Sequence, residues 1–182
     1  MAAATGIVTF LFTDIEGSTR LWELAPDAMK GALGRHDAIL RDAIETASGQ
    51  VVKTTGDGMM AVFGSAAEAV RASLAAELAL GAEPWTETGP LKVRIGLHCG
   101  QAEQRGGDFF GPTVNRTARI MAAGHGGQVL LSESACALVR DALPERASLV
   151  DLGEHRLKDI GRPEHLYQLA HPDLPAKFPP LI

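Results

Sequence analysis

The spacing of apolar residues along the chain predicts strands that alternate with helices. Residues 6–13, GIVTFLFT, are rich in β-branched and aromatic residues and apolar on both faces, which is typical of a central, buried strand. A longer segment begins at Pro26, and its apolar residues recur every three to four positions until Gly49, as on one face of a helix. Residues 51–53 and 59–63 flank an Asp-Gly turn, which predicts a hairpin.

The second half of the chain continues this alternation. A capping box over residues 65–68 precedes a helix, and residues 91–98 alternate apolar with polar side chains, as in a half-buried strand. Another helix is expected from Pro112 to Gly124. Three of its residues are predicted to face inward: Val114, Ala118 and Met121. With three more strands, at 128–131, near 149 and at 166–169, the pattern predicts an α/β sandwich in which helices cover one mixed sheet.

Composition and charge narrow the class of protein. The chain has 182 residues, of which 46% are apolar and 21% charged, as suits one globular domain. A net charge of −5 without a dense Lys/Arg cluster argues against a nucleic-acid-binding surface. No apolar run approaches the length of about 20 residues that a membrane span needs, and the N-terminal MAAATG lacks the pattern of a signal peptide. Cys99 and Cys136 are typical of packed, reduced thiols, so we expect a cytoplasmic protein. From the charge and the hydropathy we expect neither nucleic-acid nor membrane partners.

The first candidate for chemistry is Asp14, which follows the buried strand. A carboxylate at the end of a strand is exposed to the crevice where α/β proteins bind ligands. Taken alone, Asp14 also fits the cap of a following helix. Gly17, Ser18 and Thr19 begin that short helix, and the free N–H groups of a helix N-terminus suit phosphate groups.

The second candidate, Asp57, lies in the hairpin turn, where Asp-Gly is also ordinary turn chemistry. Two carboxylates brought together would bind Mg²⁺ or Mn²⁺, which prefer hard oxygen ligands. Asn115 and Arg119 are four residues apart, so they share one helix face. Such an arginine can stabilise charge in a transition state, whereas the alternative is an ordinary solvated face.

Together these residues lie in segments that resemble the successive motifs of class III adenylate and guanylate cyclases, in the bacterial subgroup with TTGDG in the hairpin. The resemblance covers about residues 6–170. The segments that carry it are FTDIEGST (12–19), KTTGDGMMAVF (53–63), RIGLHCG (94–100), GDFFGPTVNRTARIMAAGHGGQVLLS (107–132) and LGEHRLKDIGRPEHLYQL (152–169). It implies a ferredoxin-like, palm-type core with a mixed, mainly antiparallel sheet.

The resemblance also implies roles for single residues. In that family the strand-end and hairpin aspartates, Asp14 and Asp57 here, hold two divalent metal ions with help from the carbonyl group of Ile15. The asparagine that orients the ribose corresponds to Asn115, and the arginine that stabilises the transition state corresponds to Arg119. The lysine that binds the triphosphate corresponds to Lys158, where the alignment is looser.

Purine choice follows from two further positions of the family. Lys53 and Asp108 occupy the positions that read the base, and they supply a donor beside an acceptor, which matches adenine better than guanine. Alone, each would be an ordinary exposed strand or loop residue. The resemblance therefore predicts an adenylate cyclase that converts ATP into 3′,5′-cyclic AMP and pyrophosphate in a homodimer.

Several alternatives stay open at this point. The chain could be a guanylate cyclase, or a catalytically weak or silent cyclase-like module that binds nucleotide and signals. Another palm-type enzyme is disfavoured because the GGDEF signature of diguanylate cyclases is absent. Pro112, Cys99 and Gln101 depart from the common pattern of the family. The catalytic domain is expected over residues 1–170, and the Pro-rich residues 171–182 resemble a tail or a linker to further domains of a larger parent protein.

Overall fold

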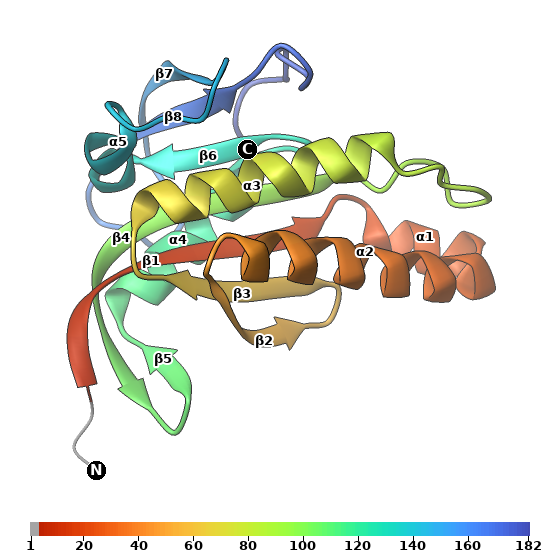
Figure 1. Ribbon diagram of the computed structural model, residues 1–182, viewed down its shortest axis with the longest axis horizontal. Coiled ribbons are helices and arrows are strands. Elements are labelled where there is room, and N and C mark those ends of the chain that lie inside the picture. Colours follow the sequence, from red (N-terminus) through yellow and green to blue (C-terminus); the bar gives the residue numbers. More distant parts are fainter. Residues whose placement is uncertain (1–3) are drawn as a thin grey trace.

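The computed structural model describes residues 4–182, so residues 1–3, which begin the expected domain and the MAAATG stretch, lie outside the described residues. Helices and strands alternate along the chain (Figure 1). The strands are β1 (Ala4–Ile15), β2 (Gln50–Thr55), β3 (Gly58–Phe63), β4 (Val93–Arg105), β5 (Asp108–Phe110), β6 (Val129–Ser132), β7 (Ser148–His155) and β8 (Glu164–Ala170). The helices are α1 (Ser18–Leu24), α2 (Pro26–Thr46), α3 (Ala66–Ala82), α4 (Pro112–Ala123) and α5 (Glu133–Val139).

The strands form a single sheet in the order β2-β3-β1-β4-β6-β8-β7, and β5 pairs with β4 outside this path. The pair β4–β6 is parallel and the other pairs are antiparallel. This confirms the predicted fold class, a mixed and mainly antiparallel sheet with helices on it. None of the helices found in residues 4–182 is long and apolar enough to cross a membrane.

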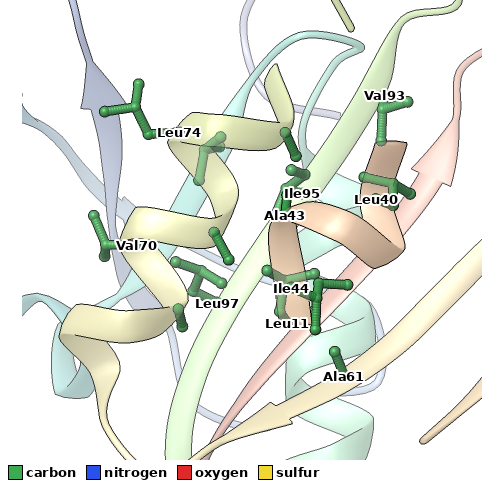
Figure 2. Close-up of a cluster of buried hydrophobic side chains, with 14 of the residues drawn as sticks. Leu11, Leu40, Ala43, Ile44, Ala61, Val70, Leu74, Val93, Ile95 and Leu97 are labelled. Atoms are coloured by element: carbon green, nitrogen blue, oxygen red, sulfur yellow. The ribbon is translucent and has the colours of Figure 1, made fainter. Parts of the chain in front are cut away.

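The main core lies between one face of the sheet and the helices α2 and α3, which run across that face (Figure 1). Leu11 of β1 and Leu97 of β4 pack there against Ile44 of α2 and Val70 of α3 (Figure 2). Strand β1 forms the centre, because it pairs with β3 on one side and with β4 along its whole length on the other.

The opposite face of the sheet carries α4, and this corrects two expectations. Strand β4 is not half-buried, since α4 lies directly over it: a Cβ on Gly96 would come within 2.6 Å of the backbone of Met121. The close approach at glycine also sets the rotation of α4. Its buried residues are Thr117, Ile120 and Ala123, and not the predicted Val114, Ala118 and Met121, which are only partly buried.

The last residues of the chain, 171–182, form no helix or strand, yet they are seated on the domain. The Nε2 atom of His125 donates to the carbonyl oxygen of Pro180 at 2.9 Å, and the backbone N–H of Ile182 donates to the carbonyl oxygen of Ala123, also at 2.9 Å. Leu181 packs beside a small apolar cluster at α4 and β6. This C-terminal segment therefore covers the loop that joins α4 to β6.

Candidate active site

The end of β1 and the β2–β3 turn lie side by side and carry the two predicted metal-binding carboxylates. Thr13 pairs with Met59, and its Oγ1 accepts a hydrogen bond of 3.0 Å from the Met59 N–H. Asp14 is the next residue of β1, and Asp57 comes directly before β3. Gly58 has no space for a side chain, because a Cβ there would clash with the carbonyl oxygen of Thr13. The glycine thus brings the turn against the strand end.

The pKa of a buried histidine, His36, is influenced by the charges of both carboxylates. His36 of α2 is completely buried, and burial lowers its pKa, while the hydrogen bond and charge of Asp37 and the charges of Asp57 and Asp14 oppose that shift. Its Nδ1 lies 2.8 Å from Asp37 Oδ1. The charges of Asp14 and Asp57 thus both favour the protonated form of His36.

Asp14 is also held by an arginine that the sequence reasoning did not single out. Arg94 of β4 lies beside Asp14 in the sheet register, and its Nη2 donates to Asp14 Oδ2 at 2.8 Å. Its Nη1 donates to the carbonyl oxygens of Ala122 and Gly124 at 3.3 and 3.5 Å, at the C-terminal end of α4. Arg94 therefore ties the strand end to the helix that carries Asn115 and Arg119.

The two predicted base-reading residues meet directly. Lys53 Nζ of β2 donates to Asp108 Oδ2 of β5 at 2.9 Å, and the N–H of Phe109 donates to Asp108 Oδ1 at 2.7 Å. These contacts, with Lys53 contributing most, hold the pKa of Asp108 below its usual range. The β4–β5 hairpin folds back to make the contact, because Phe109 packs edge-to-face on Phe10 with ring centroids 5.3 Å apart.

Asn115 and Arg119 line one surface hollow of about 590 Å³ beside α4. They share this helix face as predicted, and Asp159 forms the opposite wall with Ile160. Arg119 Nη2 donates to Asp159 Oδ2 at 2.9 Å. Lys158 is exposed and precedes Asp159 in the turn that follows β7, so its chain position is next to the hollow although it does not line it.

The expected phosphate-binding turn has the predicted local form. Gly17 precedes α1 with φ of 68°, a left-handed conformation that favours glycine, and no side chain caps the first turn of the helix. The N–H groups of Ser18 and Thr19 begin this turn, so they are free of a side-chain cap. The helix itself is short and has no buried residue.

Within the described part of the chain, the site residues thus form separate groups. No hydrogen bond or ion pair found in residues 4–182 joins Asn115 or Arg119 to Asp14 or Asp57. No group of three or more His, Cys, Asp or Glu side chains in these residues could hold a metal ion either. The expected ligand set contains only two such side chains, Asp14 and Asp57, beside the backbone carbonyl group of Ile15.

Comparison with known proteins decides what kind of domain has this arrangement. The family model described as the adenylate and guanylate cyclase catalytic domain matches residues 1–171. The chain belongs to this family. The resemblance that the motifs indicated is therefore confirmed, and the protein has a nucleotidyl cyclase catalytic domain.

Individual relatives agree with this assignment. An uncharacterized protein of Mycobacterium tuberculosis is 44% identical over 179 residues, which cover 97% of this chain and 60% of that protein. The adenylate cyclase of Lachancea kluyveri is 33% identical over 186 residues, which cover 88% of this chain and 10% of that protein. A solved structure of an adenylate cyclase from Trypanosoma brucei in its monomeric state matches with a TM-score of 0.85 and 27% identity, covering 96% of this chain and 92% of that one. The chain spans 60% or less of these two curated relatives.

The structure adds two charged contacts to the candidate site that sequence reasoning missed. Arg94 was hidden because its partner, Asp14, is 80 residues away and becomes a neighbour only through the pairing of β1 with β4. Arg116 of α4, whose Nη1 donates to Glu164 Oε2 at 2.5 Å, joins the helix to β8 beside the same hollow. A signal for Arg94 was present, since it is a charged residue near the start of β4, directly after the buried Val93.

Proposed function

We propose that this cyclase domain is an adenylate cyclase that converts ATP into 3′,5′-cyclic AMP and pyrophosphate. The contact between Lys53 and Asp108 carries the proposal, because it holds a donor and an acceptor side by side at 2.9 Å. Adenine offers an acceptor at N1 beside a donor at its 6-amino group, which is the complementary pattern. Guanine offers a donor at N1 and an acceptor at O6, and meets the same pair in partial conflict.

The residues at the β1 corner fit two divalent cations such as Mg²⁺ or Mn²⁺. Asp14 and Asp57 supply hard carboxylate oxygens from adjacent elements, and the carbonyl group of Ile15 follows on the same strand. In our proposal these three residues hold the metals. Bound there, the metals would lower the pKa of the ribose 3′-hydroxyl and neutralise charge on the phosphates.

The remaining residues would bind and orient ATP for an in-line displacement. The ribose 3′-oxygen attacks the α-phosphorus, its proton passes to solvent, and the bond to the β-phosphate oxygen breaks to release pyrophosphate. Asn115 would hold the ribose so that this oxygen is aligned, and Arg119 would stabilise the charge on the α-phosphate. Lys158 and the N–H groups of Gly17, Ser18 and Thr19 would bind the β- and γ-phosphates.

A homodimer is the second part of the proposal. No hydrogen bond or ion pair of residues 4–182 joins the β1 corner to Asn115 or Arg119, and in our proposal two chains complete each site across their interface. Apolar side chains on the face opposite α2 and α3 support this, since Val8, Phe12, Val52 and Val62 are only partly buried there. A two-fold dimer would then contain two equivalent sites.

We expect a change of purine choice when the base-reading pair is altered. In the double variant Lys53→Glu with Asp108→Ser, ATP turnover should fall much more than GTP turnover. Each lost polar contact costs about 1–3 kcal/mol, so the ratio of kcat/KM for ATP over GTP should fall at least about tenfold. Initial rates with both nucleotides and Mn²⁺ measure this ratio.

Lys30→Glu on the exposed side of α2 is the matched control for this experiment and should leave the ratio unchanged. An unchanged ratio in the double variant would contradict base reading by Lys53 and Asp108. The same assay on the wild-type chain separates the alternatives. Preferred GTP turnover would indicate a guanylate cyclase, and no turnover with either nucleotide would indicate a regulatory module.

We also expect two inactive variants to restore each other's activity. Asp57→Ala removes one half of the site and Arg119→Ala the other, so each should be inactive alone. In a random mixture half of the dimers are hybrids, and each hybrid keeps one intact site, so activity should return to about a quarter of the wild-type value. Co-expression of differently tagged chains, purified through both tags, isolates the hybrids, which should then have about half of the wild-type activity.

The pair Asp57→Ala and Asp14→Ala provides the matched control for mixing. Both changes lie in the same half of the site, so their hybrids have no intact site and should stay inactive. If Asp57→Ala and Arg119→Ala hybrids also stay inactive, one chain supplies the whole site and the shared-site model is wrong.

A further inference from the structure

A second cavity lies between α3, the start of β4 and the C-terminal segment, and it contains none of the proposed active-site residues. Its volume is about 460 Å³, enough for a small organic molecule. Leu80 of α3, Leu91 and Phe178 supply apolar surface, and Pro175 and Pro179 of the C-terminal segment extend it. The segment that covers the α4–β6 loop therefore also forms one wall of this cavity.

A buried carboxyl group faces this cavity from α3. Glu77 is only 6% exposed and lines the cavity, and within residues 4–182 its Oε1 has no hydrogen-bond partner. Buried polar oxygens are normally hydrogen-bonded, because an unpaired one costs desolvation energy. An Oε1 that lacks a partner in the protein calls for a donor from a ligand.

Positive charge lies on the lining of the same cavity. Lys92 and Lys177 both line it and are exposed, and neither forms an ion pair in the described part of the chain. His125 and Glu16 also line it, and their charged atoms lie 3.8 Å apart, so they largely offset each other when the histidine is protonated. The two lysines thus favour an anionic ligand and disfavour a cationic one.

We propose that this cavity binds a small apolar acid whose anionic group lies at Lys92 and Lys177 and whose neutral N–H group donates a hydrogen bond to Glu77. Burial raises the pKa of Glu77 to about 8, so its carboxyl group is protonated and neutral at pH 7. A protonated carboxyl accepts an N–H hydrogen bond without needing a cation. The site is independent of the cyclase reaction, since its lining residues take no part in the proposed chemistry.

Indole-3-acetate is a suitable probe, because it has an N–H group at one end, an apolar body and a carboxylate at the other. Two relatives separate these contributions: 1-methylindole-3-acetate lacks the donor, and indole lacks the anion. Calorimetric titration of the full chain at pH 7 should find one saturable site for indole-3-acetate, with binding at least about tenfold weaker for either relative.

Variants locate the binding. Glu77→Leu should remove the difference between indole-3-acetate and its methyl derivative, whereas Glu77→Gln, which keeps an acceptor oxygen, should retain it. Lys92→Met and Lys177→Met should weaken the acid towards the affinity of indole, and Arg71→Met in the groove between α2 and α3 is the control. Absence of saturable binding, equal affinity for the methylated acid, or binding unaffected by both Glu77→Leu and the lysine variants would overturn the proposal. If Glu77→Leu does not fold, the Glu77→Gln, lysine and methyl-derivative results still decide it.

Discussion

Replacing Asp57 with alanine is expected to lower cyclic AMP formation by at least about 1,000-fold, because a metal clamp supplies several kcal/mol of transition-state stabilisation and each 1.4 kcal/mol changes the rate about tenfold. The domain should stay folded, since no hydrogen bond or ion pair of the described residues depends on the Asp57 side chain. Cyclic AMP formation from ATP with Mn²⁺ and a circular dichroism melting curve, measured on one preparation, test both statements.

Asp14→Ala should lower activity as strongly but also reduce stability, which makes Asp57 the cleaner test. Removing Asp14 leaves Arg94 without its 2.8 Å partner, and Arg94 Nε already lacks a hydrogen-bond partner in residues 4–182. An uncompensated, partly buried charge costs about 1–3 kcal/mol. Asp42→Ala, on the exposed side of α2, is the control and should keep full activity. Near-wild-type turnover of Asp57→Ala would contradict the metal assignment.

Replacing Glu77 with glutamine is expected to remove a large pH dependence of stability. The pKa of Glu77 rises from 4.5 in the unfolded chain to about 8 in the folded domain, because burial disfavours the charged form. Between these values the folded state binds more protons than the unfolded state, so the free energy of unfolding falls as pH rises. At about 1.4 kcal/mol per pH unit, the gap corresponds to a loss on the order of 4 kcal/mol by pH 8.

Urea unfolding of the wild type and of Glu77→Gln between pH 5 and 9 measures this effect. The free-energy difference between the two proteins should change steadily up to about pH 8 and then level off, and other titrating groups cancel in that difference. Glu45→Gln, at an exposed position of α2, should show no such trend. Parallel curves for the wild type and Glu77→Gln would mean that the carboxyl group stays ionised and solvated in the folded domain.

Local patterns were enough to predict most of the order of elements and to single out most of the candidate residues. The Asp-Gly turn of Asp57 and the strand end at Asp14 each depend on short segments whose chemistry is visible in the chain. The contact of Lys53 with Asp108 could be expected only through the family resemblance, because a folded-back hairpin makes it. The roles of these residues in catalysis remain predictions.

The features that were missed depend on what lies across the sheet or under a helix. The rotation of α4 was mispredicted because Gly96 allows a close approach and because Thr117, a polar residue, is buried with its hydroxyl bonded to the carbonyl oxygen of Thr113 at 2.8 Å. The burial of Glu77 was not expected either, since it lies in a helical segment of Ala and Leu and lines a cavity with residues of the C-terminal segment and the start of β4. Neither packing partner can be identified from local periodicity.

The pairing of β1 with β4 also constrains how the domain folds during synthesis. Ala4 pairs with Gln104 and Ile15 with Val93, so the first strand gains its second neighbour only after residue 104 has left the ribosome. Until then the nascent sheet of β2, β3 and β1 has a long, apolar open edge, which is prone to pair with other chains. Translation pauses placed before β4 should therefore increase aggregation, and chaperone binding should concentrate on nascent chains shorter than about residue 105.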